Sequence, residues 1–159
     1  MREARSYAVL GDVERFQRAL AKAHREFDLG DDNRGNDPAW ISFYDPAELL
    51  GLEGTCWADV GQYHRAVPLL EQALSRQAPT YQRNRALYQG RLAVARLGHG
   101  DPIHAVANAT TVTLQLLESG LGSARTAELV RTVRRQVTPY RQEPAVREFA
   151  TRYDQYATA

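Results

Sequence analysis

The sequence predicts an all-α fold, a right-handed superhelix of about four antiparallel helical hairpins, with residues 1–159 as a single domain. Three observations predict it. Apolar residues recur at helical spacing along most of the chain. The breaks between these stretches are short clusters of Gly, Pro or Asp, which end one helix and begin the next. Small residues recur where the two helices of a hairpin would approach closely.

The hairpins are expected over 1–28, 45–77, 79–119 and 123–157. Three of them contain a Gly that follows an apolar helical stretch, where it can take the left-handed conformation that closes a helix at low cost. These tight turns are expected at Gly11-Asp12, Gly61-Gln62 and Gly100-Asp101.

The second hairpin has the clearest start signal. Asp45 offers a capping oxygen, Pro46 suits the first helical position, and Glu48 follows three residues after the cap. We therefore expect a helix over 45–60. Its partner is expected over 62–77, with a mild kink at Pro68 because proline removes one backbone hydrogen bond.

A long irregular segment over 29–44 precedes this hairpin and is rich in Asp, Asn and Gly. It is either a functional loop or an insertion that Trp40 and Phe43 hold against the core. A calcium loop starting at Asp31 would need Gly at its sixth position and Glu at its twelfth. Asn36 and Ser42 stand there, so calcium binding is not expected.

The run 110–117 alternates polar and apolar residues and by itself favours a strand. The chain offers no second strand to pair with it. An apolar helical face also continues through the run, formed by Ile103, Val106, Ala107, Thr110, Leu114 and Leu117. We therefore predict a helix.

The last pair of helices is expected to begin at a Ser123 cap, with its second helix starting near Pro144. An apolar stripe marks the first of these helices: Leu129, Val130, Val133 and Val137. The second is expected to cover the end of the stack, which would otherwise be an exposed apolar face, with Val146, Phe149, Tyr153 and Tyr156.

The second hairpin resembles the tetratricopeptide repeat in its order of bulky, small and aromatic residues: Leu50, Gly54, Trp57, Ala66, Leu70 and Ala73. The first and third hairpins match it in part. In the second hairpin, Glu53 departs from the usual Leu. In the first, Phe16 replaces a small residue, and in the third, Arg96 stands for an aromatic and Ala109 for a larger residue. The resemblance implies an α-solenoid that binds partners, and the chain is expected to begin inside a repeat.

Three further passages resemble the C-terminal sensor regions of bacterial helix-turn-helix regulators that carry these repeats. They are 40–49, 85–88, and Pro139-Tyr140-Arg141 with Pro144, Val146, Arg147 and Phe149. The resemblance implies a region that dimerises and binds a peptide or small molecule, and so alters DNA binding by a separate N-terminal domain. A stand-alone adaptor for protein–protein interaction is the alternative.

Composition gives little support to an enzyme. The sequence has no serine-hydrolase, phosphate-binding or dinucleotide motif, so we expect no enzyme and no cofactor. Cys56 is the only cysteine, which excludes an intramolecular disulfide and a cysteine zinc cage. His64, which lies not far along the chain, raises the possibility of a nucleophilic pair, against the alternative of a small buried thiol. The four His residues lack the spacing of a metal site.

Net charge is +1, too low for the whole molecule to attract nucleic acid, and no direct nucleic-acid binding is expected. Arg131, Arg134 and Arg135 share a helix face that could touch DNA, but a solvated face is the preferred interpretation. The sequence has neither a signal segment nor a long apolar run, so we expect a cytoplasmic protein without membrane contact.

A binding groove is the remaining hypothesis. First helices of stacked hairpins line a concave surface, and Arg and Tyr side chains suit carboxylates, phosphates and peptide backbones. The expected ligand is a peptide, a small molecule or a partner protein, and ion pairing among these residues is the alternative. The candidate residues are Glu48, Thr55, Asp59, Arg83, Arg85, Tyr88 and Arg91.

Overall fold

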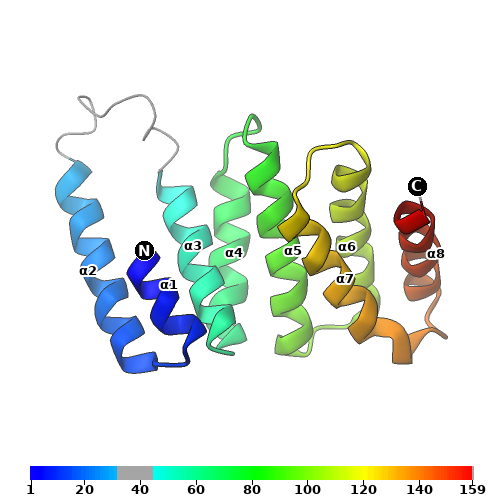
Figure 1. Ribbon diagram of the computed structural model, residues 1–159, viewed down its shortest axis with the longest axis horizontal. Helices are drawn as coiled ribbons and strands as arrows, with labels where there is room; N and C mark the ends of the chain where they lie inside the picture. The colour runs from blue at the N-terminus through cyan, green and yellow to red at the C-terminus, as the bar shows by residue number, and fades with distance from the viewer. Residues whose placement is uncertain (32–44, 159) are drawn as a thin grey trace. The chain divides into compact units, whose positions relative to one another are not determined.

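The computed structural model describes residues 1–31 and 45–158, which form helices joined by short turns and contain no strand (Figure 1). The all-α class is therefore confirmed for this part of the chain. The residues form two compact units, 1–76 and 77–159. The first unit contains α1 (Arg2–Val9), α2 (Val13–Asp31), α3 (Pro46–Asp59) and α4 (Tyr63–Arg76). The second contains α5 (Gln82–His99), α6 (Ile103–Glu118), α7 (Ala124–Val137), the 3-10 helix η3 (Thr138–Tyr140) and α8 (Pro144–Thr158).

The same turn closes α1, α3 and α5, as the glycines predicted. Gly11, Gly61 and Gly100 have φ of 73°, 75° and 90°. In each case the Gly N–H donates to the carbonyl three residues earlier, and the next N–H donates to the carbonyl five residues earlier. This pair of bonds satisfies carbonyls that a helix end leaves without partners. Gly120, with φ of 73°, makes the same turn after α6.

The predicted boundaries of the second hairpin are confirmed. The carboxylate of Asp45 accepts the Glu48 N–H at 2.8 Å, and α3 then begins at Pro46. Helix α4 continues through Pro68 without interruption from Tyr63 to Arg76. The loop expected over 29–44 is shorter at its start because α2 extends to Asp31, and 32–44 lies outside the described residues.

Helices α3 and α4 are in contact through very small residues. A Cβ atom added to Gly54 would lie 2.8 Å from Leu70 Cγ and 3.2 Å from the Ala66 carbonyl oxygen. Ala66 is 0% exposed and Ala73 is 1% exposed. The close helix approach predicted from these positions is therefore confirmed.

Trp57 joins the two hairpins of the first unit. Its ring meets Phe16 of α2 edge-on, with 4.7 Å between centroids, and the Arg65 guanidinium lies 4.5 Å from the Trp57 centroid. Glu53 accepts the Trp57 indole N–H at 3.1 Å through one carboxylate oxygen. Its other oxygen lies 2.7 Å from Nε2 of His24 on α2. Glu53 thus replaces the apolar contact expected at its position with a polar link between α2 and α3.

The second unit is built around α6, which is helical from Ile103 to Glu118 as predicted. The threonines that favoured a strand are accommodated because their hydroxyls bond the helix backbone. Thr110 Oγ1 donates to the Val106 carbonyl at 2.7 Å, and Thr111 Oγ1 to that of Ala107 at 3.1 Å. The buried core of this unit includes Val106, Ala107, Leu114, Leu117, Val130, Val133, Val137, Val146 and Phe149.

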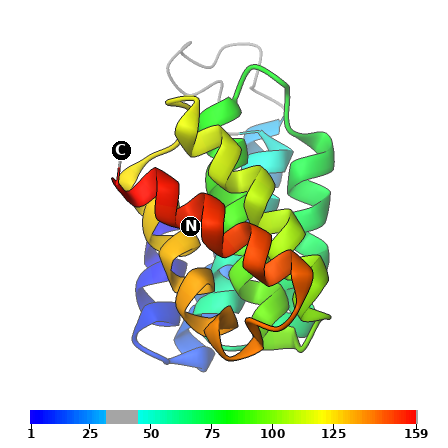
Figure 2. The same cartoon turned by 90° about the vertical axis from the view of Figure 1, so that its right-hand side faces the viewer.

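Helix α7 starts as predicted, with Ser123 Oγ accepting the Thr126 N–H at 3.2 Å. It packs against α5 where a Cβ on Gly90 would lie 3.1 Å from Leu129 Cδ1. Helix α8 lies mainly against α6 and meets α7 at few positions, as Figure 2 illustrates. Phe149 of α8 belongs to the buried core that includes α6, so α8 covers this core as predicted. Helix α8 is, however, not the close antiparallel partner of α7.

We predict that Gly54→Ala lowers the free energy of unfolding by about 1–2 kcal/mol, because the overpacking cost exceeds the gain in helix propensity. The measurement is urea denaturation. Gly30→Ala is the matched control, since Gly30 lies in α2 and no atom of the described residues is within 4 Å of an added Cβ. It should leave stability unchanged or raise it by up to about 1 kcal/mol. Equal effects of the two substitutions would contradict the close contact.

Glu53→Leu tests the polar link. It restores the residue usual in the repeat but leaves the Trp57 N–H and the His24 ring without their acceptor, so we expect a loss of about 1–3 kcal/mol. Glu53→Gln keeps a side-chain acceptor and should cost less. Denaturation followed by tryptophan fluorescence measures both, and a more stable Glu53→Leu variant would show that packing alone matters at this position.

Candidate functional site

The predicted groove residues belong to different units. Glu48, Thr55 and Asp59 lie on α3 of the first unit, and the others lie on α5 of the second: Arg83, Arg85, Tyr88 and Arg91. A common groove formed by both sets stays a prediction.

Within the first unit, Thr55 and Asp59 are engaged in local contacts. Thr55 is 3% exposed, and its hydroxyl donates to the Gly51 carbonyl at 2.8 Å. The Asp59 carboxylate pairs with the Arg5 guanidinium of α1 at 3.6 Å. Glu48 is partly exposed beside the start of α3. Thr55 therefore belongs to the protein interior, and Asp59 contributes to the α1–α3 contact.

Helix α5 is strongly basic. It contains four Arg and one His and no acidic residue: Arg83, Arg85, Arg91, Arg96 and His99. Arg83 is exposed and Arg85 and Arg91 are partly exposed, whereas Tyr88 is only 2% exposed. The buried ring of Tyr88 is not available to a ligand in this structure, so a Tyr88 substitution would alter packing as well as any site.

Of the two interpretations of Cys56, a nucleophile paired with His64 or a small buried thiol, the structure favours the buried thiol. It is 0% exposed, and burial, aided by the negative charge of Asp59, raises its pKa to about 11. At neutral pH the thiol therefore keeps its proton, and the protonated form is a poor nucleophile. His64 is exposed on α4.

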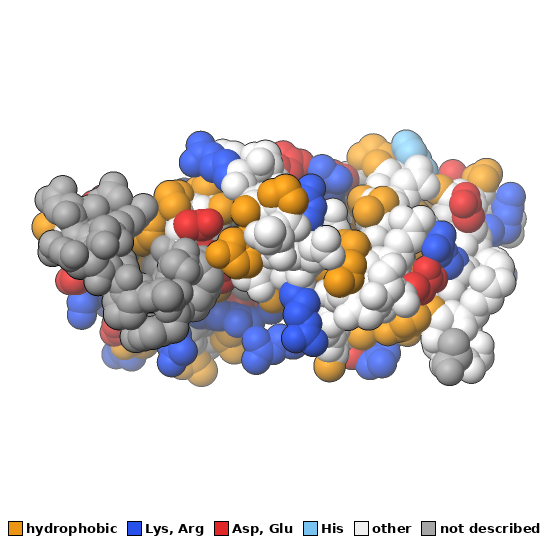
Figure 3. Space-filling model, turned by 90° about the horizontal axis from the view of Figure 1, so that it is seen from above, with side chains coloured by type: hydrophobic (Ala, Val, Ile, Leu, Met, Phe, Trp, Pro, Cys, Tyr) orange, Lys and Arg blue, Asp and Glu red, His pale blue; other side chains and the backbone are white. Residues whose placement is uncertain are grey.

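The arginines of α7 have acidic neighbours. Arg134 lies 3.4 Å from Asp154 of α8, while Arg131 and Arg135 both pair with Glu128. In the right-hand part of Figure 3, where α6 and α8 lie, basic and acidic side chains alternate. This pairing favours the solvated-face interpretation over DNA contact.

Two other expectations concern ions and membranes. The positions that argued against a calcium loop, Asn36 and Ser42, lie outside the described residues. Elsewhere, in 1–31 and 45–158, no three His, Cys, Asp or Glu side chains are grouped as a metal site. No helix in those ranges combines the length and apolar character needed to span a bilayer.

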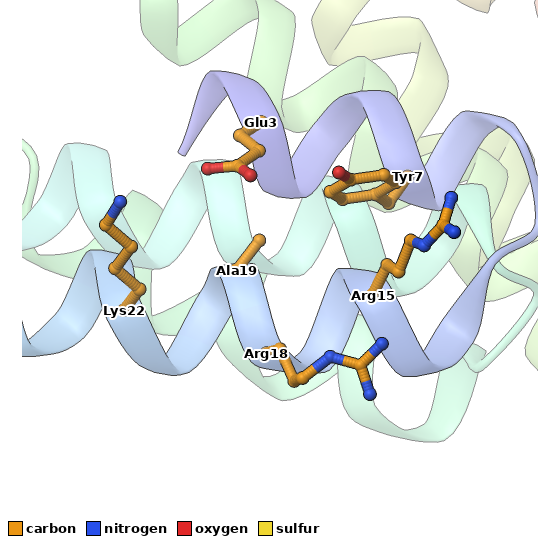
Figure 4. A pocket seen from close by; sticks show the side chains of 6 residues that line it. All are labelled: Glu3, Tyr7, Arg15, Arg18, Ala19 and Lys22. Carbon is orange, nitrogen blue, oxygen red and sulfur yellow. The ribbon is translucent and has the colours of Figure 1, made fainter.

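The structure reveals a groove between α1 and α2 that the sequence did not indicate (Figure 4). It has a volume of about 320 Å³ and is lined by Glu3 and Tyr7 of α1 and by Arg15, Arg18, Ala19 and Lys22 of α2. In the close-up the Ala19 methyl lies between the helices, near Glu3 and Tyr7 of α1, while the Arg18 side chain extends along α2 away from α1. The groove lies within the first unit.

The groove has a basic wall. The Arg15 guanidinium lies 5.9 Å from the Tyr7 ring centroid and 3.5 Å from Asp12, and Arg18 lies 3.6 Å from Glu14. Their side chains remain 63% and 68% exposed, so these are weak surface pairs. The Lys22 amine has no hydrogen bond or ion pair with the described residues. Three cations and one carboxylate, Glu3, thus surround an aromatic ring and a methyl group.

Sequence reasoning missed this groove because its signal is distributed over two helices. Tyr7 by itself is an apolar residue at helical spacing, which predicts packing rather than a site. The spacing of Arg15, Arg18 and Lys22 on one helical face was the available signal, but which face of α2 meets α1 was not known.

Comparison with known proteins adds no relationship: no family model, curated protein or solved structure matches the chain.

We expect Cys56 to resist alkylation by iodoacetamide in the folded protein at mildly alkaline pH, where about a thousandth of the thiol is ionised. The urea-unfolded chain is the control and should react rapidly. The raised pKa also means that unfolding is favoured as pH rises from 9.0 towards about 11, since the unfolded thiol loses its proton first. Equal labelling rates in both states would contradict the buried thiol.

Proposed function

We propose that this chain is a binding module of the tetratricopeptide-repeat type, acting as the sensor region of a bacterial helix-turn-helix regulator. The observation that carries the binding function is the repeated turn at Gly11, Gly61 and Gly100, with the same two hydrogen bonds each time. Hairpins of one design, each closed in the same way, are the units from which helical-repeat scaffolds are built. Such scaffolds act by presenting helix surfaces to a partner.

The packing of the first unit supports the same proposal. Gly54 and Ala66 bring α3 and α4 close together, and Trp57 joins that hairpin to α2. Bulky and small residues are thus used to stack helices, which leaves the outer faces of α1 and α2 for contacts with other molecules. The protonated Cys56 thiol also removes the one nucleophile that an enzymatic role had suggested.

The sensor role rests on the resemblance of 40–49, 85–88 and the 139–149 region to regulator sensor domains. In that role the basic helix α5 is the favoured ligand surface, because Arg side chains bind carboxylates and phosphates through paired hydrogen bonds. Dimerisation would couple ligand binding to a DNA-binding domain in the same polypeptide.

A stand-alone adaptor is the second candidate, and the α1–α2 groove favours it. The groove is open, and its Arg15 and Arg18 side chains are mostly exposed. Small-molecule sites instead enclose most of their ligand. An open groove suits a segment of another protein.

Native mass spectrometry of the protein isolated from its source tests the sensor proposal. We expect a peptide or small molecule of defined mass on the folded protein, and Arg85→Ala should reduce its occupancy several-fold. Arg76→Ala is the control, since Arg76 is exposed on α4, lies outside the passages that carry the resemblance and should leave occupancy unchanged. The sensor role would be rejected if the isolated protein carried no ligand and its gene encoded no helix-turn-helix segment. The adaptor role would then remain.

A further inference from the structure

The solvent-facing side of α2 carries an ordered row of cations. Arg15, Arg18, Lys22 and Arg25 follow i, i+3, i+7 and i+10 spacing, which places them on one face of the helix over about 15 Å. All four are exposed. Lys22 and Arg25 make no ion pair with the described residues, and Arg15 and Arg18 make only long ones, of 3.5 and 3.6 Å. We call these four residues the α2 basic row.

Apolar surface accompanies the α2 basic row. The groove beside it contains the Tyr7 ring and the Ala19 methyl. Leu29, four residues beyond Arg25, is 70% exposed. Helix α1 has 8 residues against 19 for α2, so much of the α2 length extends past it (Figure 1). A ligand for this surface therefore needs both negative charges and apolar side chains.

We infer that the α1–α2 groove and the α2 basic row bind an acidic amphipathic helix of a partner protein. This inference rests on the proposed binding function and names the site and the partner chemistry. A helix whose Asp or Glu residues repeat every three or four positions matches the spacing of the α2 basic row. Its adjoining apolar residues would pack against Tyr7, Ala19 and Leu29, as amphipathic helices do in grooves.

The charge on the rest of the first unit favours a short protein helix over nucleic acid as the partner. Residues 1–76 contain 9 Lys and Arg against 13 Asp and Glu, so the unit as a whole repels a long polyanion. Acids also lie beside the site: Glu3 in the groove, Glu26 next to Lys22 on the same face, and Asp12 and Glu14 beside Arg15 and Arg18. A short acidic helix can keep its charges on the α2 basic row, whereas a continuous phosphate backbone would also meet these carboxylates.

Fluorescence anisotropy with synthetic peptides tests the inference on the full chain. The probe is a labelled amphipathic helix with Glu at i, i+3, i+7 and i+10 and Leu on the adjoining face. The control peptide has the same composition with the Glu residues spread around the helix. We expect the patterned probe to bind at least about fivefold more tightly at low salt, and to weaken as salt screens the charges.

Paired substitutions locate the binding. Arg18→Glu/Lys22→Glu should weaken the patterned probe about tenfold or more. Arg125→Glu/Arg141→Glu changes net charge equally at exposed positions of the second unit and should alter affinity less than about twofold. Circular dichroism confirms that both variants remain folded.

Several results would overturn the inference: equal affinity for both peptides, an unchanged Arg18→Glu/Lys22→Glu variant, or tighter binding of single-stranded DNA at the same site. Sedimentation showing a dimer that Arg18→Glu/Lys22→Glu dissociates would assign the surface to a second copy of the chain and also overturn it. None of these results affects the ligand occupancy measured by native mass spectrometry, so the proposed sensor function is tested separately.

Discussion

The close approach of α3 and α4 at Gly54 is the constraint on which the first unit depends. Leu70 and the Ala66 carbonyl occupy the space that a side chain at position 54 would need. Because Gly54 has no side chain, the two helices can pack closely as a pair. That pair places Trp57 where its ring meets Phe16 of α2. The α1–α2 groove is formed by direct packing of α2 on α1, and the Trp57–Phe16 contact joins that pair to the α3–α4 hairpin.

Glu53 links this packing to polarity. A partly buried carboxylate that bonds both His24 and the Trp57 indole replaces an apolar contact with a directional one. Directional bonds fix helix orientation more narrowly than apolar contacts, at the expense of desolvating a charge. In α6, threonine hydroxyls bond carbonyls of their own helix, so these polar groups have partners in a helix that packs against the core of the second unit.

The outer surfaces of both units use charge differently. On α7, arginines pair with Glu128 and Asp154, which leaves little uncompensated charge for a partner. On α2, the cations extend into solvent beside a groove that contains an aromatic ring and a methyl group. This contrast is the reason to place a protein-binding surface on α2 rather than on the more arginine-rich α7.

Local signals in the sequence determined the helices. Gly11, Gly61 and Gly100 marked turns because only glycine takes positive φ at little cost, and Asp45 and Ser123 marked helix starts because their side chains cap backbone N–H groups. Tertiary structure decided which faces meet. It buried Tyr88 and Thr55, laid α8 against α6, gave Glu53 its two partners and opened the groove beside α2. Those outcomes depend on contacts between residues distant in sequence, which periodicity along one helix does not specify.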